Sequence, residues 1–300
     1  MKSMKFPIPV TSATLGLALL SAGCTVTLDS HTEILREEKR FTVDGTADLR
    51  VATFDGSIQI QSWDKPDILV EVEKRGPTRE ALAALQIVVD QKGNVIDLEV
   101  KRPKSESFSG LGINQSAYAR LIVSVPRSTN IRARSGDGSI RIDRVTGRIE
   151  LRTGDGSIRA SEVAGDLNFD TGDGSIVVDG AEGSLVVDTG DGSVTVTGKI
   201  GALKLHTGDG SVVYRAQPGS AMADNWEITT GDGSVTLYLP ENFGAEVDAH
   251  TGDGRITNEL NVEKDGTEDR ERRTLRGRIG PGGKALRVRT GDGAIRLKLN

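Results

Sequence analysis

Apolar and polar residues alternate along most of this chain in short runs that are separated by glycine-rich segments. Residues 49–51 and 58–60 alternate with a period of two, which is the signal of a β-strand with one buried face. Only residues 79–86 have a helical pattern, and Thr78 precedes them as the expected N-cap. The pattern predicts an all-β protein. Further strands are expected at 87–89, 95–100 and 121–125, and a loop is expected at 101–117.

One short motif recurs through the chain and sets its organisation: Thr-Gly-Asp-Gly-Ser followed by Ile or Val. A degenerate copy stands at 54–58. The first five full copies are evenly spaced and define an 18-residue unit, and the later steps are 23, 21 and 39. Such a period is the mark of a solenoid, in which each coil buries its apolar face against its neighbours. The full Gly-Asp-Gly triplets are centred on Asp137, Asp155, Asp173, Asp191, Asp209, Asp232, Asp253 and Asp292.

The 18-residue unit predicts the content of each coil. In the aligned copies 139–156, 157–174, 175–192 and 193–210, the second position is Ile or Val, and the eleventh and thirteenth are apolar. The ninth position is always glycine. We therefore expect a single elongated parallel β-solenoid, whose coils each have two short strands and two corners. One corner is expected at the ninth-position glycine and the other at Gly-Asp-Gly, with insertions at 214–226, 238–246 and 260–285.

The N-terminus has the pattern of a bacterial lipoprotein signal. Two lysines form a positive n-region, and residues 6–20 form an uncharged, largely apolar segment that is too short to span a membrane. Ala22 and Gly23 then lead into Cys24, which resembles a lipobox cysteine that is acylated and becomes the new N-terminus. Acyl chains would anchor the chain without a spanning helix. An ordinary cleaved signal with an unrelated cysteine is the alternative.

The residues after the signal are also informative. Cys24 is the only cysteine, so an intramolecular disulfide is impossible. Thr25 follows it, and by resemblance to Gram-negative lipoproteins a residue other than Asp at this position favours the outer membrane. Residues 25–40 are polar and charged, which is typical of a tether.

The corner aspartates are the recurring chemical groups of the chain. Stacked in register, their carboxylates would form a ladder along one edge of the solenoid. In a structural interpretation, Asp-Gly supplies the left-handed backbone and the side-chain hydrogen bond of a sharp corner. In a second interpretation the ladder binds Ca²⁺, although calcium repeats of the RTX type carry a different nonapeptide twice per coil. We favour the structural interpretation and expect no metal site and no cofactor.

Candidate catalytic residues are sparse. His31 lies in the expected tether, while His206 and His250 precede Gly-Asp-Gly motifs and are expected two coils apart, too far for a shared metal. Parallel β-helix enzymes cleave polysaccharides with carboxylates from adjacent coils, so a glycan-active enzyme is a further alternative. Here the acids recur uniformly, as corner residues do. We therefore expect a protein without catalytic residues.

The charge of the chain excludes one class of partner. The formal net charge is −5, which gives no reason to expect nucleic-acid binding, because that needs a basic face. Residues 272–289 include seven Arg or Lys and no acidic residue. A basic patch for anionic lipid or lipopolysaccharide is one interpretation of this segment. A solvated loop is the interpretation that we favour.

Several motifs together carry a family resemblance. They are Phe54-Asp55-Gly56-Ser57-Ile58 followed by Trp63-Asp64, the strand ending in Val125-Pro126, the repeated Thr-Gly-Asp-Gly-Ser-Ile, and the closing Ile279-Gly280-Pro281-Gly282-Gly283. Over roughly residues 41–300 the chain resembles a bacterial adhesin-like family of β-strand-repeat envelope proteins, a domain of unknown function. The resemblance implies a β-solenoid and carries over no catalytic residues.

These observations predict a lipoprotein with one folded body. Residues 1–23 are expected to be the signal peptide, and 24–40 the lipidated N-terminus and tether. Residues 41–300 are expected to be the solenoid, with degenerate coils at 41–130 and Gly-Asp-Gly repeats at 131–300. The expected function is non-enzymatic. Anchored to a membrane at Cys24, the protein would present the solenoid to a protein or glycan partner at the envelope.

Overall fold

The computed structural model describes residues 33–102, 117–264 and 272–300. These residues belong to one compact unit, Thr32–Asn300. The expected signal peptide, Cys24, most of the tether and most of the expected loop at 101–117 lie outside the described residues.

The described residues contain one short helix, α1 (Arg79–Ala84), and 23 strands. The prediction of an all-β protein is therefore confirmed. Helix α1 begins where the sequence predicts, because the hydroxyl of Thr78 accepts a hydrogen bond from the backbone N–H of Ala81 at 3.2 Å. The helix is too short to organise the fold, which depends on the strands.

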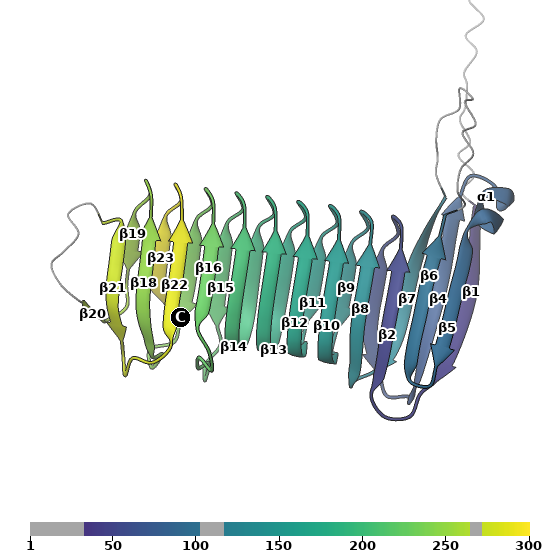
Figure 1. Cartoon of the computed structure of the whole chain (residues 1–300), viewed down its shortest axis with the longest axis horizontal. Coiled ribbons are helices and arrows are strands. Elements are labelled where there is room, and N and C mark those ends of the chain that lie inside the picture. Colours follow the sequence, from purple (N-terminus) through teal and green to yellow (C-terminus); the bar gives the residue numbers. More distant parts are fainter. Residues whose placement is uncertain (1–32, 103–116, 265–271) are drawn as a thin grey trace, which may run out of the picture. The chain divides into compact units, whose positions relative to one another are not determined.

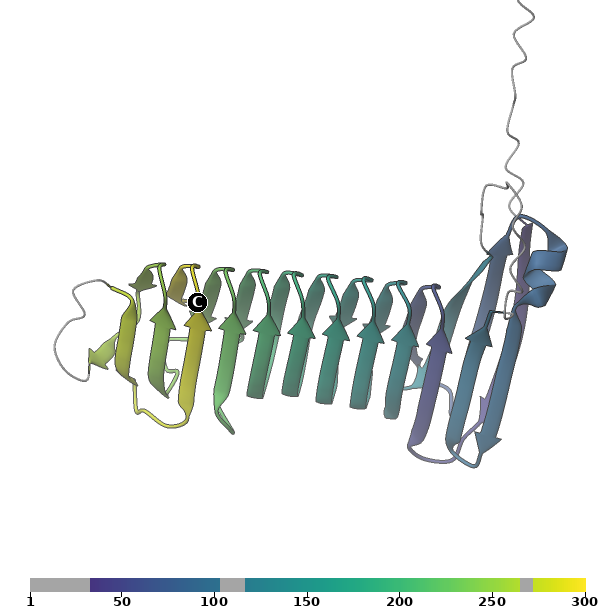
Figure 2. The same cartoon turned by 45° about the horizontal axis from the view of Figure 1, so that its top comes forward.

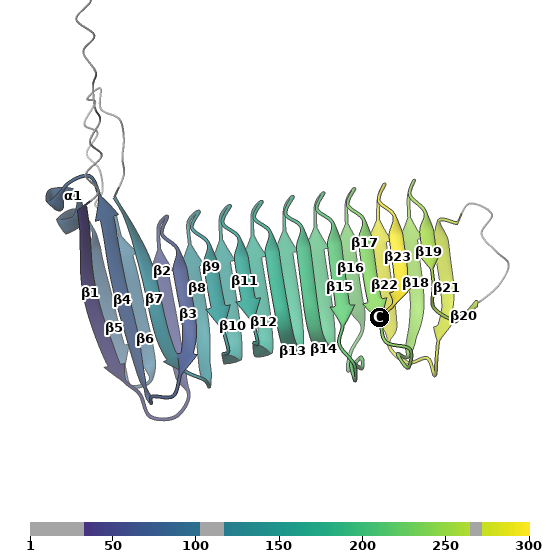
Figure 3. The same ribbon diagram turned by 180° about the vertical axis from the view of Figure 1, so that it is seen from behind.

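The strands form two walls that face each other across the core (Figures 1 and 3). The first wall contains, in spatial order, β5 (Gln86–Lys92), β6 (Val95–Lys101), β2 (Ala47–Thr53), β8 (Thr129–Ser135), β10 (Thr146–Thr153), β12 (Ala164–Thr171), the second halves of β13 (Ile176–Thr189) and β14 (Val194–Thr207), β16 (Trp226–Thr230), β22 (Ala285–Thr290), β18 (Ala245–Thr251), β21 (Thr274–Ile279) and β20 (Val262–Lys264).

The second wall runs in the same direction and contains β1 (Glu33–Thr42), β4 (Asp67–Gly76), β7 (Tyr118–Pro126), β3 (Ile58–Trp63), β9 (Ile140–Asp143), β11 (Ile158–Ser161), the first halves of β13 and β14, β15 (Val212–Ala216), β17 (Val235–Leu239), β23 (Ile295–Leu299) and β19 (Ile256–Asn258).

In the middle of both walls the strands are parallel and in register. Leu167 pairs with Ile149 on one side and with Leu185 on the other, each exactly one repeat away in the sequence. All three side chains are buried, as the apolar eleventh position of the repeat predicts. Asn168 and Val186, one residue later, point outward and are exposed. The strand period of two therefore gives this part of the chain a dry interior and a polar exterior in a solenoid-like repeat.

The walls are not parallel throughout, so the expectation of an exclusively parallel solenoid is wrong at both ends. At one end β1–β4, β4–β7 and β5–β6 are antiparallel pairs. At the other end β21 pairs antiparallel with β18 and with β20. Antiparallel strands thus extend the walls beyond the last parallel coil, and β1, β5, β19 and β20 are the edge strands.

The order of the strands in space also departs from their order in the sequence. The β2–β3 coil lies between the coils β6–β7 and β8–β9. The last coil, β22–β23, lies between β16–β17 and β18–β19. The segment 260–285, expected as an insertion, contains β20 and β21, and after it the chain returns into its own stack with β22. Likewise, residues 272–289 are not a solvated loop but contribute β21 and β22.

The second corner of each coil is displaced from the predicted position. It lies at the sixth position of the repeat, where Arg144, Glu162 and Gly180 have φ values of 58°, 52° and 69°. The ninth-position glycines, such as Gly165, are already inside the next strand segment. A methyl group on Gly165 would lie 2.2 Å from the carbonyl oxygen of Gly147, so close stacking requires glycine there.

Candidate interaction surface

The Gly-Asp-Gly corners form the narrow turns along one edge of the stack (Figure 2). The threonine before each corner links its coil to the adjacent coil by hydrogen bonds. The Thr189 hydroxyl lies 3.2 Å from the carbonyl oxygen of Gly172 and 3.1 Å from that of Gly174, and it donates toward both. Thr171 and Thr207 make the equivalent contacts. The motif therefore serves stacking, because its buried hydroxyls satisfy carbonyl groups of the neighbouring coil.

The corners need glycine because the backbone of the neighbouring coil lies too close for a side chain, and not because the backbone there is left-handed. None of the corner glycines and none of the corner aspartates has a φ in the left-handed region. A methyl group on Gly174 would instead lie 2.1 Å from the carbonyl oxygen of Gly156. The structural interpretation of Asp-Gly as a left-handed corner is therefore wrong. The corner is narrow because consecutive coils stack backbone on backbone there.

The aspartates of the motif are solvent-exposed, from Asp137 to Asp292. Their spatial order differs from their sequence order, because the corner of Asp292 stacks between those of Asp232 and Asp253. Within residues 33–102, 117–264 and 272–300, no group of three or more His, Cys, Asp or Glu side chains is arranged to hold a metal ion. The structure thus places one exposed carboxylate per coil along this edge.

A threonine substitution tests the role of the corner hydroxyl. Thr189 is 1 % exposed, and Thr189→Val keeps its shape while removing the donor to two carbonyl groups. We expect a loss of about 1–3 kcal/mol in the free energy of unfolding. Thr195→Val is the matched control, since Thr195 is exposed on the outer face of the second wall. Chemical denaturation of both variants measures the difference, and equal stabilities would contradict the assignment.

The outer face of the first wall carries three aligned rows of side chains, which are all polar except Val186. One row runs through Arg132, Glu150, Asn168 and Val186, on the adjacent strands β8, β10, β12 and β13. A second row runs beside it through Arg134, Arg152, Asp170 and Asp188. A third row contains Asn130, Arg148, Asp166 and Ser184. None of these side chains contributes to the core, so they are available for contacts with other molecules.

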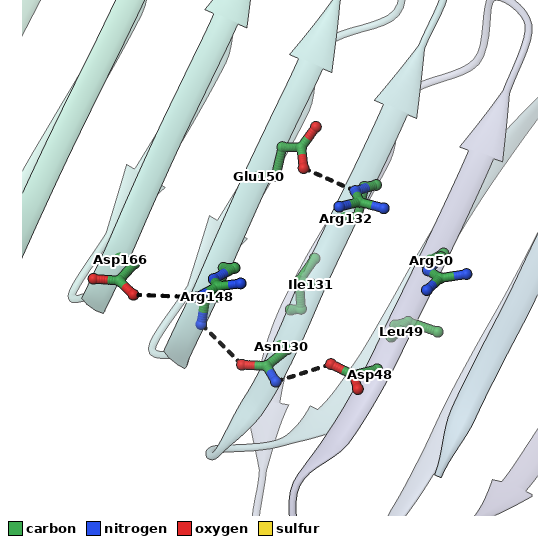
Figure 4. A pocket seen from close by; sticks show the side chains of 9 residues that line it. All are labelled: Asp48, Leu49, Arg50, Asn130, Ile131, Arg132, Arg148, Glu150 and Asp166. Carbon is green, nitrogen blue, oxygen red and sulfur yellow. Dashed lines mark hydrogen bonds and ion pairs between the residues drawn. The ribbon is translucent and has the colours of Figure 1, made fainter. Parts of the chain in front are cut away.

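The third row borders a hollow of about 460 Å³ on this face (Figure 4). Asn130 lies in the hollow and bridges two strands. Its Nδ2 donates to Asp48 Oδ1 at 2.8 Å, and its Oδ1 accepts from the backbone N–H of Arg148 at 2.9 Å. Arg50 and Asp166 also line the hollow. The hollow therefore offers both hydrogen-bond donors and acceptors.

Glu150 lies at the centre of the basic part of this face. Arg132 Nε donates to its carboxylate at 2.8 Å, and Arg134 and Arg152 each approach it to 3.4 Å. Partial burial favours the neutral carboxyl, but these guanidinium groups outweigh it and hold the pKa of Glu150 below its ordinary value. Three arginines thus share one carboxylate, so this part of the face keeps an excess of positive charge.

The signs of the charges change abruptly along the first wall. Residues 128–159 contain seven arginines and four acidic residues, whereas 160–198 contain eight acidic residues and no Arg or Lys. On the outer face this puts arginines on β8 and β10, next to aspartates on β12 and β13. The contacts across the boundary are long. Arg148–Asp166 and Arg152–Asp170 each measure 3.9 Å, and all four side chains are at least 46 % exposed.

The second row continues beyond Asp188 to the two histidines, because His206 on β14 pairs with Asp188. In space, His206 is followed by Thr229, Arg289 and then His250, so the two histidines are three strands apart and not two coils. His250 Nδ1 lies 3.0 Å from the hydroxyl of Thr274. His31 lies outside the described residues. The charged face was not predicted from the motifs, although a count of charges coil by coil reveals the change of sign.

A stack of coils with repeated corners, a dry core and a polar exterior defines a solenoid-like repeat protein of the all-β class. The family model Toastrack DUF4097 matches residues 46–298, and the chain belongs to this family. The expectation of an adhesin-like domain of unknown function is thereby confirmed.

Solved structures with similar folds come from several bacteria. A candidate lipid-binding protein from Parabacteroides distasonis is 14% identical with a TM-score of 0.49, over 87% of this chain and 96% of that one. A candidate adhesin from Parabacteroides merdae is 12% identical with a TM-score of 0.41, over 87% and 95%. A candidate cell adhesion protein from Clostridium sporogenes is 15% identical with a TM-score of 0.28, over 89% and 100%. No curated protein matches the chain.

In the parts of the chain that the structure describes, no helix is long and apolar enough to cross a bilayer.

Proposed function

We propose that this chain is a lipid-anchored, non-enzymatic envelope protein that presents the outer face of its first wall to a protein or glycan partner. In this proposal Cys24 carries the acyl anchor, and the protein resides at the outer membrane of a Gram-negative cell. The presenting body is a parallel β-solenoid of 18-residue coils with Gly-Asp-Gly corners, extended by antiparallel strands at its ends.

The observation that carries the proposal is that one set of side chains stabilises the stack, while a different, charged set lies on its outer face. Apolar residues and the threonine and glycine residues of the corners are used to stack the coils. On β8, β10, β12 and β13 the charged residues of the first wall face outward in register, and their ion pairs are either shared, as around Glu150, or long, as between β10 and β12. Exposed ion pairs of this kind contribute little to stability, about 0–1 kcal/mol each. A binding role explains their arrangement better than a contribution to folding.

The anchor is tested at Cys24. Because Cys24 supplies the only thiol in the sequence that can carry the lipid, Cys24→Ser should move the protein from membranes into soluble fractions. The measurement is fractionation of cells followed by detection of the chain, with Ser21→Ala as the control for a change near the cleavage site. Retention of the Cys24→Ser variant in membranes at the wild-type level would contradict the lipoprotein assignment.

The presentation of a surface is tested by capture. The chain from residue 24 onward, with Cys24→Ser so that it carries no acyl group, retains the whole compact unit Thr32–Asn300. Immobilised in its folded form, it should retain a protein or glycan component from an envelope extract at low salt. The same matrix bearing thermally unfolded chain is the control. Equal recovery from folded and unfolded chain would contradict the proposal.

A further inference from the structure

We infer that a partner of the first wall is a second copy of this chain, bound through the strands β8, β10, β12 and β13. This inference rests on the proposed function, because it names the partner of the same surface. The two halves of the surface carry opposite charges in the same rows, with arginines on β8 and β10 and aspartates on β12 and β13. Such a surface is complementary to itself under a two-fold rotation.

The geometry of the complex follows from the register. The two-fold axis runs parallel to the strands and lies in the contact plane between β10 and β12. The two-fold rotation about this axis brings two first walls face to face. Strand β10 then faces β12 of the partner copy, and β8 faces β13. The rows are preserved, because the rotation reverses the order of the strands but leaves positions along the strands unchanged.

Each row then meets a complementary row. Arg148 faces an aspartate equivalent to Asp166, and Arg152 faces the equivalent of Asp170. Arg134 faces the equivalent of Asp188, because both residues are in the row of Arg152 and Asp170. By symmetry each contact occurs twice. A rotation about an axis parallel to the stack would instead place arginines against arginines, so the register selects the first arrangement.

The middle row adds the remaining contacts. Val186 is 41 % exposed, which is unusual for a large aliphatic side chain, and it faces the partner's Arg132. The methylene stem of an arginine can cover an exposed apolar group while its guanidinium stays in contact with water. Glu150 meets the partner's Asn168, an uncharged amide, so on these four strands the row brings no like charges together.

Association through such exposed charges depends on salt and concentration. The arginines of one copy and the aspartates of the other attract and orient the two copies. This attraction weakens as the Debye length falls. An acyl anchor would confine the copies to one surface and raise their effective concentration. We therefore expect weak self-association in dilute solution and stronger association on a membrane.

Two double variants test the inference by exchange of charge. One has Arg134→Asp and Arg152→Asp, and the other has Asp170→Arg and Asp188→Arg. Each variant presents one sign along the whole second row, and self-association of each should fall by at least about tenfold. When the two variants are mixed, the second row of one is acidic and that of the other is basic. The two variants should therefore form a heterodimer. Sedimentation velocity on the chain from residue 24 onward, carrying Cys24→Ser, measures both effects.

A third variant and the salt dependence control the experiment. Arg141→Asp and Arg159→Asp make the same charge change on the second wall, on the strands β9 and β11, and should leave self-association unchanged. Wild-type chain should dimerise at about 0.01 M salt, where the Debye length is about 30 Å, and dissociate at about 1 M, where it is about 3 Å.

The outcomes separate this inference from the proposed function. Failure of the mixed variants to associate, with both variants folded, would overturn the inference, as would a wild-type chain that stays monomeric on vesicles and in solution at low salt. If such a monomeric chain still captures an envelope component through the first wall, the proposed function stands and only the identity of the partner is wrong. Loss of both capture and self-association would overturn the two proposals together.

Discussion

Gly174→Ala is expected to lower the free energy of unfolding by about 3 kcal/mol or more, the upper range for overpacking a closely packed site. The added methyl group would lie 2.1 Å from the carbonyl oxygen of Gly156 and 2.8 Å from the hydroxyl of Thr171. Both are parts of the stacked corner, and the carbonyl belongs to the backbone, which cannot rotate away. Relief of the clash requires the coils to separate, and this breaks the hydrogen bonds of the corner.

Asp173→Ala is the matched control for this substitution. Asp173 is adjacent in sequence, but its side chain is exposed and its φ is not left-handed. We expect a change within about 0.5 kcal/mol, as for an ordinary surface position. Thermal or chemical denaturation of both variants provides the comparison. If Asp173→Ala proves as destabilising as Gly174→Ala, the aspartate has a role in the corner that stacking does not explain.

Leu167→Asp is expected to be at least as damaging, because it places a charge in the dry interior between the walls. Leu167 is 2 % exposed and lies between Ile149 and Leu185, which are both fully buried. Loss of the buried leucine alone costs about 2–5 kcal/mol, and an unpaired buried carboxylate adds several more. The variant should fail to form the central coils at ordinary temperature.

The neighbouring position shows whether this effect depends on the register. Asn168→Asp makes a similar change in charge one residue later, on the exposed outer face of β12. Its effect on stability should stay within about 0.5 kcal/mol. Circular dichroism during thermal unfolding is sufficient to distinguish the two variants. Equal melting temperatures would show that the assignment of inward and outward positions is wrong.

The repeat was predicted well because the core and the corner each have a simple physical signature. The apolar second, eleventh and thirteenth positions follow from the strand period of two, and the structure buries Ile158, Leu167 and Phe169 accordingly. The glycines of the corner were also recognised, although for the wrong reason. Sequence alone does not distinguish a glycine needed for a positive φ from one needed because a neighbouring carbonyl lies too close.

The order of the last coils could not be predicted for a different reason. Coils with the same motif can stack on the same neighbour, so the sequence pattern does not distinguish the coil of Asp253 from that of Asp292. The structure stacks the corner of Asp292 on that of Asp232, and beyond the coil of Asp253 β21 pairs antiparallel with β18 and β20 with β21. That pairing leaves a place between β16 and β18, and β22 fills it. No local signal in the sequence encodes this choice.

The candidate surface could not be predicted from the sequence, for a related reason. Outward positions were recognised as polar, but their significance depends on which strands are neighbours. Arg134 and Asp188 are three repeats apart in the sequence, yet the register aligns them in one row of the first wall. The recurring aspartates of the corners are the conspicuous acids of the sequence, and they lie along the edge of the stack. The charged face lies on the wall beside it.

The most direct test of the account compares capture of an envelope component by the two walls. Wild-type chain, the first-wall variant with Arg134→Asp and Arg152→Asp, and the second-wall variant with Arg141→Asp and Arg159→Asp are immobilised in equal, folded amounts. The account predicts that the first-wall variant loses the component, whereas the second-wall variant retains it at the wild-type level. Loss on the second-wall variant with retention on the first-wall variant, or equal retention by all three, would contradict the assignment of the first wall as the binding surface.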